Sequence, residues 1–164
     1  MIAVQVERLS FHFPTDWQVG KYDDWAFYRN QFVRQFNGLQ GVDLIAHAAD
    51  GTAFLIEVKD YRHPDTEKPS ALPQAIANKV LMTLAALLPA KLHATAADEQ
   101  ALAAAVLTCK RLHVIAHVEL PRAHRAPIDP ADLRLKLKQL LRAVDPHPTV
   151  VSTTNMRGLA WTVS

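Results

Sequence analysis

Three side chains have the types and the spacing for metal-dependent chemistry: Asp43, Glu57 and Lys59. Each lies in an apolar run, and a charge buried among apolar residues is costly unless it is paired or bound to a metal. Two carboxylates can hold one hard cation such as Mg²⁺, which keeps several of its water ligands. An ammonium nearby can orient a metal-bound water or stabilise charge on a phosphate. The three residues therefore predict a divalent-cation site with hydrolytic chemistry.

Two apolar runs must position these residues, residues 42–48 and 52–59, with Ala49-Asp50-Gly51 between them. A three-residue loop of this kind closes a β-hairpin, and glycine suits its last, left-handed position. The expected register pairs Ala48 with Thr52, Ala46 with Phe54, Leu44 with Ile56, and Asp43 with Glu57. Because successive side chains alternate between the faces of a sheet, Asp43, Glu57 and Lys59 share one face at the end away from the turn.

A purely structural interpretation also fits these charges. A carboxylate paired with a lysine at a strand end, shielded by solvent, needs no ligand. Both faces of the hairpin are rich in Leu, Ile, Val and Phe, so we expect it to be central in the sheet and covered on both sides. In an unrelated α/β domain the cluster would then have no affinity for a metal.

The hairpin resembles the PD-(D/E)xK nuclease superfamily. The resemblance is carried by Val42-Asp43, the apolar run Phe54-Leu55-Ile56, and Glu57-Val58-Lys59, and by element order it covers about the first two-thirds of the chain. It departs from the family at Val42, where a proline is common. It implies a Mg²⁺-dependent nuclease, with Mn²⁺ as a substitute, that hydrolyses phosphodiester bonds of DNA, RNA being the other substrate. Asp43, Glu57 and the carbonyl of Val58 would bind the metal, and Lys59 would assist catalysis.

The resemblance also directs attention to accessory residues. Members of this superfamily often carry an acidic residue on the helix before the hairpin, which makes Asp24 the candidate and Asp23 its substitute; capping of that helix explains either residue equally well. Gln74 and Lys79 begin the covering helix, where the family often places a Gln or a Lys. Three residues after the hairpin are candidates for contact with the nucleic-acid backbone: Arg62, His63 and Lys68.

Composition bounds the remaining possibilities. The chain has 164 residues, 49% of them hydrophobic and 21% charged, which suits one globular domain over residues 1–164. A net charge of +2 is compatible with nucleic acid but lower than a dedicated non-specific binder usually carries. No run looks long and apolar enough for a membrane span, and the lone Cys109 cannot form an internal disulfide, so we expect a cytoplasmic protein without a membrane partner.

The other elements follow from periodicity and capping signals. We expect strands at 1–13, 110–120, 149–153 and 159–163, and helices at 23–36, 71–93, 94–108 and 131–144. His113 and His117 would share a strand face, but the spacing that indicates zinc on a helix is missing. The predicted fold class is α/β, restriction-endonuclease-like: a mixed central sheet flanked by helices, with an extra N-terminal strand and a C-terminal helix plus strands.

A second functional hypothesis keeps the fold without the catalysis. The chain would then be a nucleic-acid-binding or protein-interaction module. The low net charge, and the lack of a recognisable DNA-reading motif, favour a homodimer or a partner protein that supplies specificity. The presence of Asp43, Glu57 and Lys59 together favours the enzyme.

Overall fold

Five strands form the larger sheet of the computed structural model, which describes residues 1–63, 71–121 and 128–164. Their order across the sheet is β3 (Gln18–Lys21), β4 (Leu44–His47), β5 (Thr52–Asp60), β6 (Arg111–Glu119) and β7 (Thr149–Val151). The pairs β3–β4 and β4–β5 are antiparallel, whereas β5–β6 and β6–β7 are parallel. The sheet is therefore mixed, as predicted.

The central hairpin has the predicted register. Leu44 pairs with Ile56 and Ala46 with Phe54, and the backbone N–H of Ala48 donates to the carbonyl of Thr52 at 2.8 Å. Gly51 has a φ of +85°, the left-handed conformation that the loop requires and that an L side chain rarely adopts. This register fixes which side chains share a face at the far end of the hairpin.

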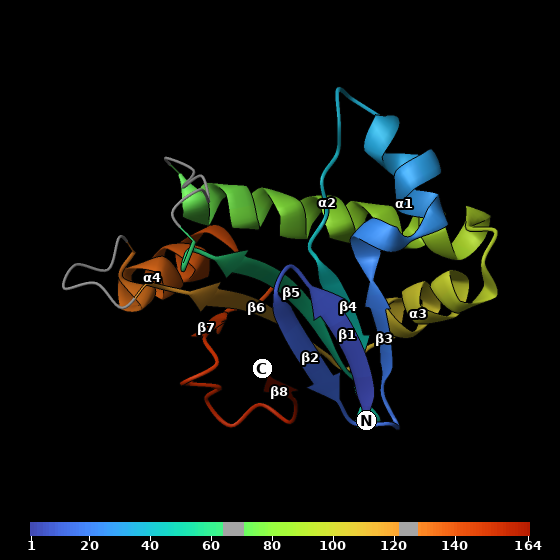
Figure 1. The fold of residues 1–164 in the computed structure, drawn as a ribbon. Helices are drawn as coiled ribbons and strands as arrows, with labels where there is room; N and C mark the ends of the chain where they lie inside the picture. Colours follow the sequence, from blue (N-terminus) through green and yellow to red (C-terminus); the bar gives the residue numbers. More distant parts are fainter. Residues whose placement is uncertain (64–70, 122–127) are drawn as a thin grey trace.

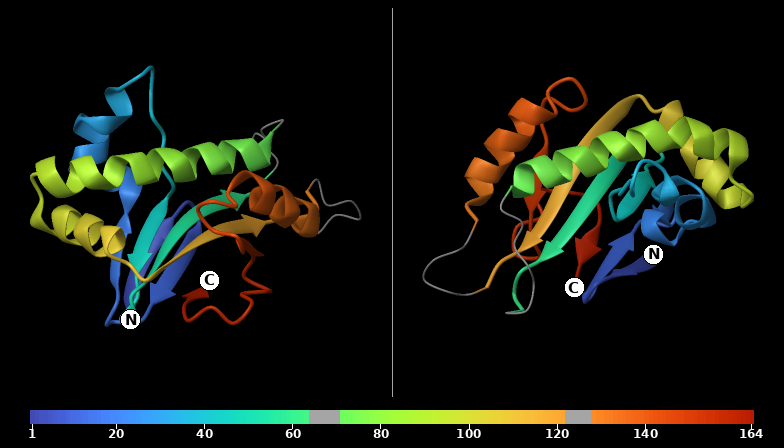
Figure 2. Two further views of the ribbon diagram at one scale, coloured as in Figure 1. Left: turned by 180° about the vertical axis from the view of Figure 1, so that it is seen from behind. Right: turned by 90° about the horizontal axis from the view of Figure 1, so that it is seen from above.

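Helices cover one face of this sheet and a second sheet covers the other (Figures 1 and 2). The covering helices are α2 (Leu72–His93), α3 (Ala97–Leu107) and α4 (Pro130–Leu140). On their side Leu55, Val114 and Leu87 belong to one buried cluster. The smaller antiparallel sheet comprises β1 (Ile2–Val6), β2 (Leu9–Phe13) and β8 (Thr162–Val163), in that order. On its side Phe11, Ile56, Ile115 and Trp161 form the second buried cluster.

Two expectations for the N-terminal part were wrong. Residues 1–13 form the hairpin β1–β2 of the smaller sheet rather than one added edge strand, and the chain reverses at Glu7, whose φ is +53°. The expected helix at 23–36 is split into the 3₁₀ turn η1 (Tyr22–Asp24), the helix α1 (Ala26–Asn30) and the 3₁₀ turn η2 (Phe32–Arg34). β3 was not predicted.

The split helix has an identifiable cause in a distant side chain. The buried carboxylate of Glu99, on α3, accepts the backbone N–H groups of Ala26 at 2.6 Å and Phe27 at 3.2 Å. These are the orphan donors of a helix that begins after Trp25, so the cap sets the start of α1. Aromatic residues, which dominate this segment, have only modest helix propensity and do not extend the helix against that constraint.

The C-terminal half follows the predictions more closely. α4 begins at Pro130 after its predicted cap, since Asp129 Oδ1 accepts the N–H of Ala131 at 2.9 Å, but α4 ends at Leu140 rather than at Val144. Pro89 lies within α2 without stopping it. By length and composition α2 could also cross a membrane, contrary to the expectation from the sequence. In this fold it lies across the sheet with Ile76, Val80 and Leu87 buried, and a covering helix needs an apolar composition for that reason.

Candidate active site on the helix-covered face

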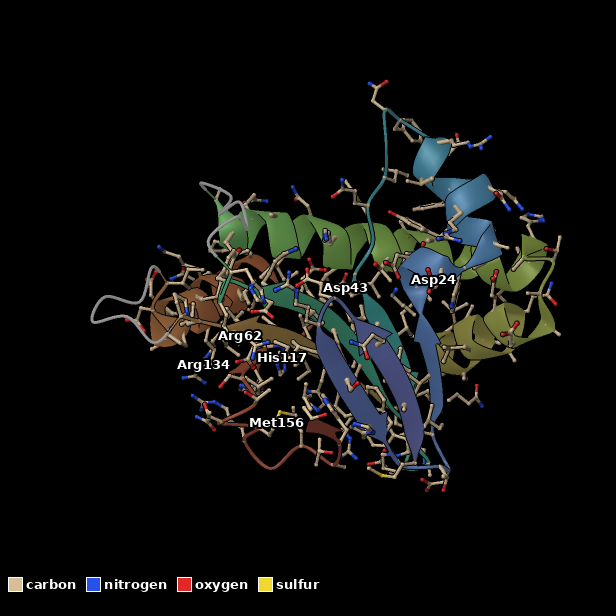
Figure 3. All side chains as sticks on the ribbon, in the orientation of Figure 1. Asp24, Asp43, Arg62, His117, Arg134 and Met156 are labelled. Atoms are coloured by element: carbon tan, nitrogen blue, oxygen red, sulfur yellow. The ribbon has the colours of Figure 1, made fainter. Side chains whose placement is uncertain are left out.

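The predicted triad converges on the helix-covered face of the sheet. Asp43 lies where the chain enters β4, below α2 (Figure 3), and its Oδ2 accepts the backbone N–H of Val58 at 2.7 Å. Glu57 and Lys59 point to the same face as Leu55 because they are two and four residues along β5. The hairpin thus brings the two carboxylates onto neighbouring strands, as its register requires.

Two ammonium groups bind the same oxygen of Glu57. Lys59 Nζ lies 2.8 Å from Oε1, and Lys79 Nζ, which comes from α2, lies 2.7 Å from it. The Glu57 side chain is fully buried, whereas the two lysine side chains are about one-fifth to one-quarter exposed. The predicted accessory residue Lys79 is therefore in direct contact with the site, and the cluster contains two acidic and two basic groups.

One oxygen in this cluster has no partner. Glu57 Oε2 is buried and makes no hydrogen bond to any of the described residues. A buried acceptor left unpaired costs about 1–3 kcal/mol, so it marks a position where a ligand would be stabilising. The oxygen belongs to one of the two carboxylates that the sequence assigned to a metal.

The electrostatics of Asp43 also indicate an incomplete site. Burial, followed by repulsion from Glu57, raises the pKa of Asp43 from its ordinary value of 3.8 to about 6. Burial lowers the pKa of Lys59, but the charge of Glu57 and its hydrogen bond outweigh burial, so that the pKa of Lys59 is raised overall. At neutral pH the lysine is therefore a cation and a hydrogen-bond donor, and Asp43 is ionised at a cost that a bound cation would offset.

Two further polar groups, Tyr28 and Asp23, come from the segment before β4 in which the sequence predicted an accessory acidic residue. The pKa of Tyr28 is raised, chiefly by burial, with Asp23, Asp43 and Glu57 adding to the shift. The pKa of Asp23 is raised by burial, with Asp24 and Asp43 as further causes, and its Oδ1 is buried without a partner among the described residues. The charges of Asp23 and Asp43 therefore influence each other.

Glu7 is the residue that sequence reasoning missed. It lies at the turn of the β1–β2 hairpin, and its pKa is raised first by partial burial and then by the charge of Asp43. A signal for this turn was present: apolar residues occupy even positions from Ile2 to Val6 and odd positions from Leu9 to Phe13. A change of phase in a period-2 pattern marks a chain reversal.

The other predicted residues lie elsewhere. Asp24 is half exposed and makes ion pairs of 3.4 Å with Lys21 and Arg29. Gln74 Nε2 donates to Asn78 Oδ1 at 3.0 Å on the exposed side of α2. The guanidinium of Arg8 contacts the ring of His63. Lys68 lies outside the described residues. The guanidinium of Arg62 donates two hydrogen bonds to the carboxylate of Asp60.

Two carboxylates from this cluster suit a magnesium ion better than a metal with a complete protein cage. Within residues 1–63, 71–121 and 128–164, no group of three His, Cys, Asp or Glu side chains is arranged to hold a metal. Mg²⁺ is commonly bound through one or two carboxylates and keeps its other positions for water and substrate phosphates. The unpaired Oε2 of Glu57 and the raised pKa of Asp43 fit such an ion.

A second polar cluster lies on the opposite face of the same strands. Asp60, which is 2% exposed, accepts two hydrogen bonds from the Arg62 guanidinium, at 2.8 and 2.6 Å. Buried His117 donates from Nε2 to Glu119 Oε1 at 2.9 Å (Figure 3 labels Arg62 and His117). His113, on the same strand face, lies 3.6 Å from Asp145 instead. The two histidines therefore pair with different carboxylates, and the sequence lacks the spacing that indicates zinc.

Comparison with known proteins relates this chain to a part of a longer protein. No family model matches the chain, and no solved structure matches it. A cysteine–tRNA ligase from Neisseria meningitidis serogroup A is 31% identical to it over 209 aligned residues. The match includes all of this chain but only 30% of the length of the ligase. The chain is thus similar to a part of a longer protein that acts on tRNA.

Proposed function

We propose that the protein is a Mg²⁺-dependent nuclease with a restriction-endonuclease-like fold, acting on the phosphodiester bonds of DNA. The observation that carries the proposal is the cluster at the end of the β4–β5 hairpin. It presents one unpaired carboxylate oxygen on Glu57 and two ammonium groups. It also contains the carboxylate of Asp43, whose pKa is raised by burial and by the charge of Glu57. Most buried polar atoms have a hydrogen-bond partner, so an unpaired carboxylate oxygen beside a second carboxylate favours a site that takes a cation.

The side chains divide the chemistry between them. Asp43 and Glu57 would hold the ion, which supplies a polarised water and neutralises charge on the phosphate. Lys59 keeps its proton because its pKa is raised, so its role is to donate a hydrogen bond to the phosphate or to position the water, and not to abstract a proton. Lys79 donates to Glu57 Oε1 from α2, and Oε2 stays without a hydrogen-bond partner among the described residues and is the oxygen that would bind the ion.

The arrangement of elements is compatible with the proposed fold. An antiparallel hairpin carries the acidic residues, a parallel strand lies next to it, and α2 packs over the face that bears the cluster. The departures lie at the N-terminus, where a short helix and a second sheet replace the expected long helix and edge strand.

A second candidate function is the binding of tRNA without cleavage. It is favoured by the similarity of this chain to part of a cysteine–tRNA ligase. In that case the lysines would contact the RNA backbone, and the carboxylates would serve mainly to orient them. The balance of two acidic and two basic groups argues against a site built for backbone contact alone, since such sites carry an excess of positive charge.

The test compares cleavage with binding on the same substrates. Purified protein is incubated with single-stranded, duplex and branched DNA and with tRNA, in Mg²⁺, Mn²⁺ or EDTA, beside Glu57→Gln and Asp43→Asn. Asp98→Asn, an exposed carboxylate on α3, is the matched control. We expect metal-dependent cleavage that falls about 100-fold or more in both site variants, equivalent to about 2.7 kcal/mol of barrier, and is unchanged in the control.

Each other outcome has a definite meaning. Equal cleavage by all four proteins would show that the activity lies outside this cluster or belongs to a contaminant. No cleavage, combined with binding of tRNA in EDTA, would replace the nuclease with the binding function. Cleavage of tRNA alone would keep the chemistry and change the substrate.

A further inference from the structure

A pocket of about 550 Å³ opens at the carboxyl ends of the parallel strands β6 and β7, beside the end of β5. Ligands in open α/β sheets commonly bind outside the carboxyl ends of strands. Asp60 and Glu119 point from β5 and β6 toward the face covered by the smaller sheet, whereas Glu57 points toward α2. None of the nuclease-site residues Asp43, Glu57, Lys59 and Lys79 is among the described residues that line the pocket, so the pocket is separate from the proposed nuclease site.

A buried carboxylate fixes one wall of this pocket. Both oxygens of Asp60 are occupied by Arg62: Oδ1 by the side-chain Nε and the backbone N–H, and Oδ2 by Nη2. The guanidinium is thus held as a fork while 39% of the Arg62 side chain stays exposed at the pocket. A guanidinium held in one orientation loses less conformational entropy when it binds an anion.

A second buried carboxylate fixes the opposite wall. Glu119 accepts the backbone N–H of Thr153 at 2.6 Å and its hydroxyl at 3.2 Å, in addition to His117. The chain then folds back through reciprocal backbone hydrogen bonds between Ser152 and Asn155, at 3.2 and 3.0 Å. The loop after β7 is therefore held in place, and it presents hydroxyl and amide groups, followed by Arg157, to the pocket.

The pocket presents two guanidinium groups, which carry only hydrogen-bond donors. The charge of Asp60 is balanced by Arg62, and both oxygens of Glu119 already accept hydrogen bonds. Arg157 makes no ion pair with any carboxylate of the described residues. Among the described residues, the lining also includes the apolar residues Val118, Leu120, Pro121, Pro130 and Val150.

We propose that this pocket binds the terminal phosphate of a nucleotide. The phosphate would lie between Arg62 and Arg157, near the hydroxyls of the loop after β7, and the sugar and base would lie on the apolar wall. Two guanidinium groups match the geometry of phosphate oxygens. The volume lies within the range of small-molecule sites, which combine an apolar lining with a few placed polar groups. The phosphate could belong to a free nucleotide or to the end of a strand.

The experiment measures binding of defined probes by isothermal titration calorimetry in EDTA, so that the proposed metal site does not contribute. The probes are thymidine, thymidine 5′-monophosphate, and an oligothymidylate with a 5′-phosphate, with a 3′-phosphate or with neither. The variants are Arg157→Gln and Arg62→Lys, which keeps a cation beside Asp60. Arg142→Gln, an exposed arginine outside the pocket, is the matched control, and Glu57→Gln tests independence from the nuclease site.

We expect the monophosphate to bind and thymidine to bind at least tenfold more weakly. Arg157→Gln and Arg62→Lys should each weaken binding about tenfold, whereas Arg142→Gln and Glu57→Gln should leave it unchanged. Tighter binding of one phosphorylated oligonucleotide would identify a strand end as the source, and preference for the mononucleotide would identify a free nucleotide. Equal binding of thymidine, no effect of Arg157→Gln, or no binding of any phosphorylated probe would overturn the proposal, whatever the result of the cleavage assay.

Discussion

Strand β5 carries charged side chains to both faces of the sheet, and the two resulting clusters differ in how completely they are satisfied. On the helix-covered face, Glu57 keeps one buried oxygen without a partner, and Asp43 is ionised only above an unusually high pKa of about 6. On the opposite face, both oxygens of Asp60 and of Glu119 accept hydrogen bonds. The first cluster therefore keeps an unpaired carboxylate oxygen despite its two lysines, whereas the carboxylate oxygens of the second cluster are all paired.

The difference shows how one strand can serve stability and function together. Buried carboxylates whose oxygens are all paired rigidify their surroundings, which suits the walls of a pocket, although Nδ1 of the buried His117 has no partner among the described residues. An incompletely satisfied cluster lowers the stability of the fold and persists where a ligand or a reaction makes use of it. Substitutions in the two clusters should therefore change stability in opposite directions.

The largest effect on stability is expected for Glu119→Ala. The substitution leaves the N–H of Thr153 and the Nε2–H of His117 without their acceptor in a buried position. We expect a loss of about 3 kcal/mol in the free energy of unfolding, measured by urea denaturation at pH 7. Glu119→Gln, which keeps an acceptor, is the control and should lose less. A loss under about 1 kcal/mol in Glu119→Ala would show that this cluster does not hold the pocket walls.

Asp43→Asn should increase the free energy of unfolding, in contrast to Glu119→Ala. The pKa of Asp43 is higher in the folded protein than in the unfolded chain, so the folded state binds more protons between about pH 4 and pH 6, and its stability falls as the pH rises through that window. The neutral amide avoids this loss and can still accept the N–H of Val58. We expect a gain of about 2 kcal/mol at pH 8 that disappears below about pH 4.

Thermal or urea unfolding of both proteins across this pH range checks the sign. Added Mg²⁺ should stabilise the natural protein at pH 8 and should not stabilise Asp43→Asn, because a bound cation relieves the same charge. If Asp43→Asn is less stable than the natural protein at pH 8, the negative charge of Asp43 is already balanced by its neighbours. The two charge clusters would then not differ in this respect.

The hairpin and its cluster could be predicted because the information is local. A period-2 apolar pattern and a glycine in the loop fix the register, and the register alone places Glu57 opposite Asp43. The long helices were also predictable, since apolar residues recur at helical spacing in α2 and a cap precedes α4. In these segments, local preferences and tertiary packing agree.

The N-terminal part could not be predicted in this way because its structure depends on distant contacts. Glu99 sets the start of α1 from more than 70 residues away, and β3 is too short to show a pattern of its own. Lys79 was placed near the active end by its position on α2, but its contact with Glu57 depends on how the helix packs on the sheet. The pocket beside β7 depends on three strand ends that only the fold brings together.

A smaller effect should result from Lys79→Met, which tests how the first cluster is balanced. Lys79 lowers the pKa of Asp43, so its removal should raise that pKa by a fraction of a unit above about 6. Carbon-detected NMR titration of the Asp43 carboxyl group measures this directly, without reliance on any activity. Lys91→Met, at the exposed end of α2, is the matched control and should leave the titration unchanged. An unchanged pKa of Asp43 in Lys79→Met would show that the charge of Lys79 does not influence Asp43.

The smallest effect concerns the neighbours Asp23 and Asp24, whose side chains are 47% and 52% exposed and both lie within 4.0 Å of Lys21. Asp24 belongs to exposed ion pairs with Lys21 and Arg29, so Asp24→Asn should cost less than about 0.5 kcal/mol. The pKa of Asp23 is raised by burial and by nearby carboxylates, and one of its oxygens has no described partner, so Asp23→Asn should be slightly stabilising at pH 7. Urea denaturation of the two variants side by side gives the signs. If the protein binds Mg²⁺, Asp23→Asn should weaken that binding more than Asp24→Asn, because the charge of Asp43 contributes to the raised pKa of Asp23. Equal weakening by Asp24→Asn would favour Asp24, which the sequence first indicated, as the accessory residue.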